Sequence, residues 1–223
     1  MKVCNGVIKM LSARQAKQLI SDLKEREISL GRQPETWFTY ENHIMGVATV
    51  AKTIALKIPD MNVDEIYISA LLHDICRTEE SREQRFHGIL GYEKLKDIDE
   101  KSARSALLHM FPWNKLPNYE KCSDMFFNRK DDYDFITNYI DSHKTTDEDL
   151  LIQLADSLAN KNGVVTLEQR DKEYSERHNI EIPKEMIEPR YKLKAYFDNK
   201  VGCDVYGLLL SQHENQIYSG KDR

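Results

Sequence analysis

Residues 41–58, with the sequence ENHIMGVATVAKTIALKI, decide the fold class of this chain. Their apolar side chains recur at the i, i+3, i+4 and i+7 spacing of an amphipathic helix, at Ile44, Val47, Ala48, Ala51, Ile54, Ala55 and Ile58. Pro59 follows directly and cannot continue a helix. The stretch therefore predicts a long helix from about Glu41 to Ile58, with one buried face and one polar face.

Helical patterns continue on both sides of this stretch. A helix is expected from Ser12 to about Ile28, and another begins after Asn62, whose side chain can cap it, and runs through Ile75. Shorter apolar runs predict further helices over residues 86–95, 100–110, 135–141 and 150–158. Thr145-Thr146-Asp147-Glu148 has the Thr-x-x-Glu spacing of a capping box, placed just before the last of these helices.

The rest of the chain is less regular. Residues 113–132 show no clear period, the polar stretches 166–178 and 184–198 are separated by Pro183, and an apolar run lies at 205–210. Only 9 glycines and 6 prolines occur, so few short strands and hairpins are expected. We therefore predict an all-α bundle of roughly eight to ten helices, folded as a single domain.

Length and charge limit the classes of function. The chain has 223 residues, enough for one domain with a sizeable core. Acidic residues number 37 against 32 basic ones, giving a formal net charge of −5 without a long basic stripe, so we expect no binding to duplex nucleic acid. No apolar run reaches the roughly 18 residues of a membrane helix, so no membrane association is expected. Residues 1–11 make a poor signal peptide.

The cysteines carry no metal or disulfide motif. Cys4, Cys76, Cys122 and Cys203 lie far apart and form no Cys-x-x-Cys pair, which excludes a zinc ribbon. Their number and spacing are typical of reduced thiols, so we expect a cytoplasmic protein. The sequence leaves a homodimer open.

Four polar residues interrupt the apolar faces of the predicted helices. His43 stands one turn before Val47, His73-Asp74 interrupts ALLHDI (70–75), and Asp156 stands within LLIQLADSL (150–158). Taken singly, each is more often a satisfied core residue than a ligand. A buried carboxylate without a partner is costly, however, and all four are explained together if they meet at a metal ion.

The order His43, His73-Asp74, Asp156 resembles the H…HD…D signature of the HD superfamily of metal-dependent phosphohydrolases. The surrounding segments NHIMGVA (42–48), ALLHDI and LADSL (154–158) match as well. The resemblance implies an HD-domain helical bundle within a single domain 1–223. Its parts would be the core at about 40–162, an N-terminal helix in 1–35 and additional C-terminal helices in 163–223. A first metal ion would be bound by His43, His73, Asp74 and Asp156.

Two further histidines resemble ligands of family members that hold two ions. FHGILGYE (86–93) is similar to their His-x-x-x-Gly element, and ALLHMFP (106–112) contains the next histidine. By this resemblance, His87, His109 and a bridging Asp74 would bind a second ion. The alternatives are a substrate contact for His87 and a structural helix end for His109. The imidazole and carboxylate ligand types do not identify which of Fe, Mn, Zn, Ni, Co and Mg is bound.

Basic side chains near these motifs are candidates for substrate binding. Arg77 lies one turn after His73, where many two-metal relatives have lysine, and its planar guanidinium suits a phosphate. Its alternative role is a solvated helix end. Lys161 and Asn160 follow Asp156 and are further phosphate candidates, although a lysine at a helix end ordinarily interacts with the helix dipole. The other histidines are expected at the surface: His143, His178 and His213.

The resemblance implies metal-assisted hydrolysis of a phosphoester or phosphoanhydride. Asp74 and Arg77 would take part in catalysis, and Arg77 and Lys161 would bind the substrate. The favoured substrate is a small phosphorylated molecule such as a nucleotide or a dinucleoside polyphosphate. Two alternatives use the same ligands, because some HD-fold proteins are di-iron oxygenases and others are non-catalytic modules that bind a nucleotide. No Gly-Tyr-Pro element is present, which argues against a cyclic-dinucleotide phosphodiesterase.

Overall fold

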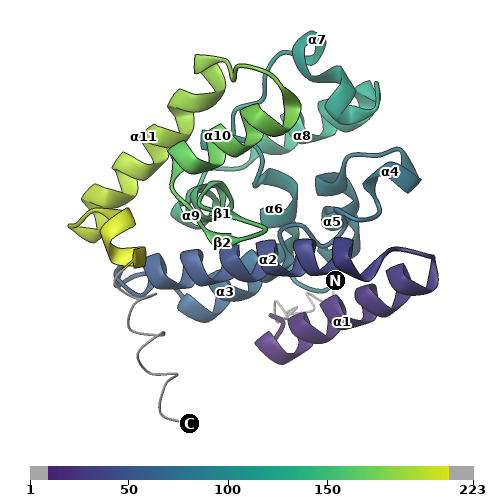
Figure 1. Ribbon diagram of the computed structural model, residues 1–223, viewed down its shortest axis with the longest axis horizontal. Helices are drawn as coiled ribbons and strands as arrows, with labels where there is room; N and C mark the ends of the chain where they lie inside the picture. The colour runs from purple at the N-terminus through teal and green to yellow at the C-terminus, as the bar shows by residue number, and fades with distance from the viewer. Residues whose placement is uncertain (1–9, 211–223) are drawn as a thin grey trace, which may run out of the picture.

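A computed structural model describes residues 10–210 of the chain and shows a helical bundle (Figure 1). Its helices are α1 (Ala13–Ser29), α2 (Pro34–Ala55), α3 (Val63–Leu72), α4 (Glu80–Glu83), α5 (His87–Leu95), α6 (Glu100–Leu108), η1 (Pro112–Asn114), α7 (Tyr119–Cys122), η2 (Ser123–Phe126), α8 (Lys130–Ser142), α9 (Asp147–Ser157), α10 (Leu167–His178) and α11 (Lys184–Val201). The predicted all-α class is confirmed.

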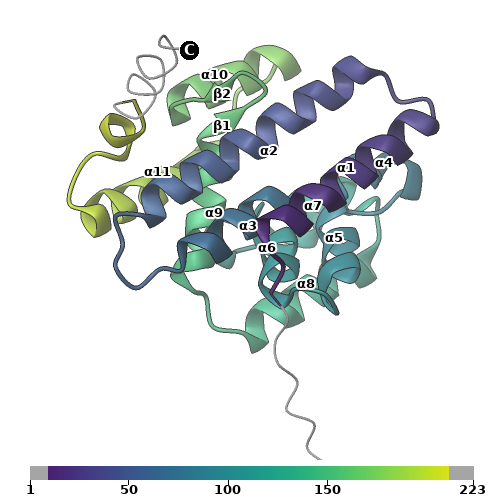
Figure 2. The same cartoon turned by 90° about the horizontal axis from the view of Figure 1, so that it is seen from below.

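The long helix α2 is the centre of the core. Ile44, Val47 and Ala51 are fully buried on it, as the period of residues 41–58 predicts. Helix α3 packs against α2 on one side and against α6 on the other, and α9 also packs against α2. Figure 2 shows α1 running beside α2 along the same edge of the bundle. The four helices α2, α3, α6 and α9 thus meet around one interior region.

Helices α5 and α6 form a tight pair beside this core. An added Cβ at Gly91 would lie 2.9 Å from the Cβ of Ala106, so only glycine permits the observed approach. Phe86, Phe111 and Phe126 are buried in a second apolar cluster next to the pair. The close approach brings the beginning of α5 to the end of α6, which carry His87 and His109.

Several of the predicted helix ends are displaced, since α3 ends at Leu72 and not at Ile75, and α8 begins at Lys130 and not at residue 135. Helix α2 begins at Pro34, well before Glu41, because proline is favoured in the first turn of a helix, where no intrahelical N–H bond is required. The predicted Thr145–Glu148 capping box lies one residue early. The cap of α9 is Thr146, whose hydroxyl accepts from the backbone N–H of Asp149, while the Asp149 carboxylate accepts from the N–H of Thr146. The cap at Asn62 is confirmed, since its side chain accepts from the N–H groups of Asp64 and Glu65.

The C-terminal third contains a small strand pair that the sequence did not predict. Strands β1 (Ala159–Asn160) and β2 (Gly163–Val164) pair antiparallel directly after α9, with Ala159 opposite Val164. Helix α11 then packs against α9 and η1, so the extension covers the end of α9. Within residues 10–210, no helix combines the length and apolar character needed to cross a membrane.

Candidate metal centre

Five elements bring six residues to one place inside the bundle. His43 comes from the middle of α2, and Asp156 from the last turn of α9. The other four stand at helix ends, since His73 caps the C-terminus of α3, Asp74 follows it, His87 opens α5 and His109 caps the C-terminus of α6. The structure therefore brings together every histidine and aspartate that the resemblance implied as a ligand.

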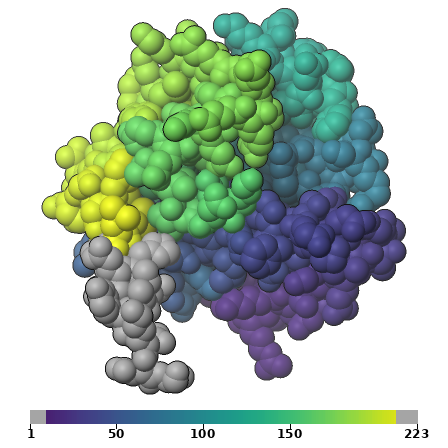
Figure 3. All heavy atoms as spheres, in the orientation of Figure 1, coloured from purple at the N-terminus to yellow at the C-terminus, as the bar shows by residue number. Residues whose placement is uncertain are grey.

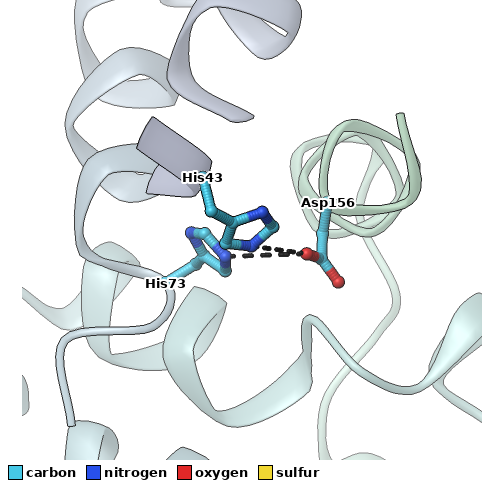
Figure 4. A group of neighbouring side chains, drawn as sticks. All are labelled: His43, His73 and Asp156. Carbon is cyan, nitrogen blue, oxygen red and sulfur yellow. Dashed lines mark ion pairs between the residues drawn. The ribbon is translucent and has the colours of Figure 1, made fainter. Parts of the chain in front are cut away.

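One set of these residues faces one carboxylate oxygen of Asp74. The Nε2 atoms of His43 and His73 each lie 3.8 Å from Asp74 Oδ2. Asp156 approaches the same two rings, and its Oδ1 lies 3.1 Å from His43 Nε2 and 3.8 Å from His73 Nε2. Figure 4 shows the two imidazoles pointing at the Asp156 carboxylate across the space between α2, α3 and α9. We call His43 and Asp156 the α2–α9 side of Asp74.

The other oxygen of Asp74 faces a second pair of histidines. Asp74 Oδ1 lies 3.1 Å from His87 Nε2 and 3.3 Å from His109 Nε2. These two Nε2 atoms are themselves 3.2 Å apart. We call His87 and His109 the α5–α6 side of Asp74. The two oxygens of one carboxylate thus divide the cluster into two neighbouring groups.

Hydrogen bonds on the outer nitrogens orient three of the rings. The Nδ1–H of His73 donates to the carbonyl of Ala70 at 2.7 Å, and that of His109 donates to the carbonyl of Ala106 at 2.9 Å. His87 Nδ1 lies 2.8 Å from the carboxylate of Glu80. A ring that donates through Nδ1 presents the Nε2 lone pair, so all three rings turn an electron pair toward the cluster.

These lone pairs fit a cation. His73 Nε2 is buried and, within the described part of the chain, has no hydrogen-bond partner. His87 and His109 direct two Nε2 lone pairs at each other and at an ionised carboxylate, an arrangement that is unfavourable unless positive charge lies among them. Ligands of a tetrahedral ion with bonds of about 2.1 Å lie about 3.4 Å apart, close to the separations found here. The donor set of imidazoles and carboxylates suits first-row divalent metals.

Burial and mutual charge set the protonation of the cluster. Burial lowers the pKa of His73 to about 4, so this ring is neutral near pH 7. Burial raises the pKa of Asp74, but His73, His109 and His87 outweigh it and hold that pKa well below its usual range. Burial lowers the pKa of His43, whereas the hydrogen bond and charge of Asp156 raise it above its usual value. The ligands are thus deprotonated carboxylates and at least one neutral imidazole.

A cleft of about 830 Å³ leads to the cluster. His109 and Asp156 lie at its inner end. One wall is the segment from Met110 to Met125, and the other is formed by α10 and the start of α11. Figure 3 shows these walls at the end of the molecule opposite α1. Because the cleft reaches the metal centre, a small molecule can approach it from solvent.

The two residues predicted to bind the substrate, Arg77 and Lys161, lie outside this cleft. Arg77 Nη1 forms an ion pair with Glu80 and lies 3.3 Å from His87 Nδ1, with half of its side chain exposed. Lys161 lies in the β1–β2 turn and lines a separate depression with Phe38 and Met45 of α2. Neither Arg77 nor Lys161 is among the described residues that line the cleft. The structure therefore brings Arg77 to the edge of the metal centre and does not bring Lys161 to the cleft.

The remaining histidines are on the surface where they are described. His143 ends α8 and stacks on Tyr139 at 4.0 Å, and His178 lies on Tyr174 at the end of α10. Both are exposed, as predicted. His213 and Cys4 lie outside the described residues. Among the described cysteines, Cys76, Cys122 and Cys203 are free thiols.

The sequence did not reveal the role of Glu80. Its carboxylate accepts from both the backbone N–H and the ring Nδ1–H of His87, at 3.2 and 2.8 Å, and it is paired with Arg77. It is held at the start of a four-residue helix, α4, inside a stretch that reads as a charged connection. Glu80 belongs to no periodic pattern in the sequence, because its contact with His87 depends on how the chain folds back and not on local spacing.

The fold and the site together define an all-α protein with histidine and aspartate side chains placed to hold divalent metal ions. The family model of the HD domain matches residues 40–161, more than half of the chain. The chain therefore belongs to the HD-domain family, whose members are commonly metal-dependent phosphohydrolases. Comparison with curated proteins and with solved structures gave no match.

Proposed function

We propose that this HD-domain protein hydrolyses a phosphoester or phosphoanhydride bond of a small, nucleotide-like substrate. The observation that carries the proposal is the division of the ligands by Asp74, whose two oxygens face separate histidine groups at 3.1–3.8 Å. Such a carboxylate is suited to bridge two cations. We therefore assign one ion to His43, His73, Asp74 and Asp156, and a second to Asp74, His87 and His109.

Divalent ions at this centre would polarise a phosphoryl oxygen and lower the pKa of water toward neutrality. The chain's own residues supply the framework for this chemistry. Glu80 and the carbonyls of Ala70 and Ala106 hold the imidazoles in one orientation, so little reorganisation is needed during reaction. Arg77 adds positive charge beside His87. The cleft admits a substrate to the centre at His109 and at the partly exposed Asp156.

Metal removal and restoration test this function. Protein is purified without added metal, its metal content is measured, and its turnover is assayed on aryl phosphates, nucleotides and dinucleoside polyphosphates. We expect hydrolysis of at least one substrate class, its loss after treatment with a chelator, and its return with a divalent cation. Anaerobic conditions should leave the rate unchanged.

Three results would contradict the proposal. Oxygen uptake by an iron-loaded protein without phosphoester hydrolysis would identify an oxygenase. A nucleotide-dependent rise in the melting temperature without turnover of any substrate would identify a binding module. Turnover that survives complete removal of metal would show that the centre is not catalytic.

A further inference from the structure

The cleft carries a positive charge that the metal centre does not use. Five basic side chains line it, against two acidic ones, Asp156 and Glu185, in a chain whose net charge is −5. The basic residues are Lys115, Lys121, Arg170, Arg190 and Lys192. A concentration of one sign of charge in a concave site attracts ligands of the opposite sign. The cleft therefore holds more positive charge than one phosphate at the metal centre requires, and it is suited to an anion with several negative charges.

Arg170 differs from the other basic residues of the cleft because it is partly buried without an ion pair to any described residue, whereas Lys115 and Lys121 are exposed. Arg190 is paired with Asp171 at 2.6 Å, and Lys192 lies 3.7 Å from Glu188. Arg170 is partly buried on α10, yet within residues 10–210 no carboxylate lies within 4.0 Å of its guanidinium. A partly buried guanidinium normally has a partner, because its desolvation is costly. Arg170 is also close enough to His43 for their charges to interact, so it lies near the metal ligands.

The outer cleft presents apolar surface. Met110, Tyr174 and Met186 line it and are 37%, 37% and 53% exposed, although large apolar side chains of this kind are usually covered. Tyr174 stands one helical turn after Arg170 on α10, so the two side chains share a face of that helix. Along the same wall, the basic side chain of Arg170 is thus followed by an apolar outer part at Tyr174.

The opposite wall is held in a fixed shape. Trp113 has a left-handed backbone conformation with φ of 61°, which is uncommon for a bulky residue. Its backbone N–H donates to the buried Gln153 side chain at 2.9 Å, and its indole N–H donates to the carbonyl of Pro189 at 3.1 Å. These bonds connect η1 to α9 and to α11. The cleft is therefore a preformed site between fixed walls.

From these contacts we propose that Arg170 binds a second phosphate of the substrate, next to the phosphate held at the metal centre. The substrate class is then an organic di- or polyphosphate whose apolar or aromatic group lies between Tyr174 and Met186. Lys115 and Lys121 on the opposite wall attract its remaining charge. The inference rests on the proposed function for the position of the first phosphate, and it assigns to Arg170 the role that the sequence suggested for Lys161.

Equilibrium binding to the metal-containing protein tests the proposal. The probes are AMP, with one phosphate, and the methylene-bridged analogue of ADP, which has two and resists hydrolysis. Arg170→Gln should weaken binding of the ADP analogue by about 10- to 100-fold, because a charge-assisted bidentate contact is lost. Binding of AMP should weaken by less than about threefold. Arg170→Lys should fall between Arg170→Gln and the wild type, because it keeps the charge and loses the planar fork.

Lys172→Gln is the matched control. It removes one positive charge from the same helix at a side chain that is 76% exposed and does not line the cleft. Equal affinity of Arg170→Gln and Lys172→Gln for the ADP analogue would overturn the proposal. If Arg170→Gln unfolds, Arg170→Lys decides the question by the same comparison.

The outcome separates this inference from the proposed function. Hydrolysis with no dependence on Arg170 would leave the metal-dependent reaction intact and refute the role of the cleft. Binding of the ADP analogue that depends on Arg170, in a protein that hydrolyses nothing, would support the cleft and refute the hydrolase.

Discussion

The two sides of Asp74 are built differently. On the α5–α6 side, the side chains of His87 and His109 are 1% and 2% exposed, and a hydrogen bond fixes Nδ1 of each ring. On the α2–α9 side, the side chains of His43 and Asp156 remain 15% and 22% exposed and contact each other directly. The difference indicates a rigid, more deeply buried ion site next to a more exposed one, and the cleft reaches one ligand of each, His109 and Asp156.

Removal of the carboxylate shared by both sides has the largest expected effect. Asp74→Ala should lose metal from both sites and lower hydrolysis by at least about 1000-fold, since metal ions contribute several kcal/mol to such reactions. Metal content and turnover are measured on one preparation. Asp131→Ala, at a side chain that is 70% exposed, is the control for folding. Full metal content and turnover in Asp74→Ala would refute the site.

Single histidine variants separate the two sides. His87→Ala and His43→Ala should each lower the metal content from two ions per chain to one, because each removes a ligand from only one group. Elemental analysis of both proteins checks this outcome. A wild-type protein that holds one ion and keeps it in His87→Ala would show that the α5–α6 side binds no metal.

Glu80→Gln tests the fixed character of the α5–α6 side. The change weakens the carboxylate–imidazole contact at His87, so affinity for one of the two ions should fall by about 10- to 100-fold. Titration against a competing chelator measures both affinities. The matched control is Glu83→Gln on the same short helix, because Glu83 pairs only with Arg82 among the described residues. If Glu80→Gln instead weakened binding of the ion on the α2–α9 side, the assignment of Glu80 to the α5–α6 side would be wrong.

Gly91→Ala has the smallest expected effect and acts on stability. The added methyl group would meet Ala106 Cβ at 2.9 Å and force α5 away from α6, which should cost about 1–3 kcal/mol in the free energy of unfolding. Urea unfolding measures the loss. Gly207→Ala has room for its methyl group, with the nearest atom at 3.7 Å, and should be neutral or slightly stabilising. Equal stability of the two variants would show that the helix pair is not tightly packed.

The sequence predicts most of the core and the metal centre for related reasons. The period at Ile44, Val47 and Ala51 fixes which face of α2 is buried, and the structure buries that face. His73 and Asp74 interrupt an apolar run, and a polar residue in such a place requires partners. Local pattern thus identifies both the helices and the residues that need an explanation.

The cleft and the supporting residues could not be predicted in this way. Glu80 and Arg170 lie in polar stretches where nothing distinguishes them from solvated charges, and their significance comes from neighbours far along the chain. Lys161 shows the reverse case. It is close to Asp156 in sequence, but the β1–β2 turn carries it to a different depression. Tertiary contacts between non-periodic segments decide these positions.

The central claim is that two cations bind on opposite sides of Asp74, and anomalous X-ray diffraction of crystals of the metal-loaded protein tests it most directly. We predict two anomalous peaks, one bonded to Asp74 Oδ2, His43, His73 and Asp156, and the other to Asp74 Oδ1, His87 and His109. A single peak, or peaks that Asp74 does not bridge, would contradict the account.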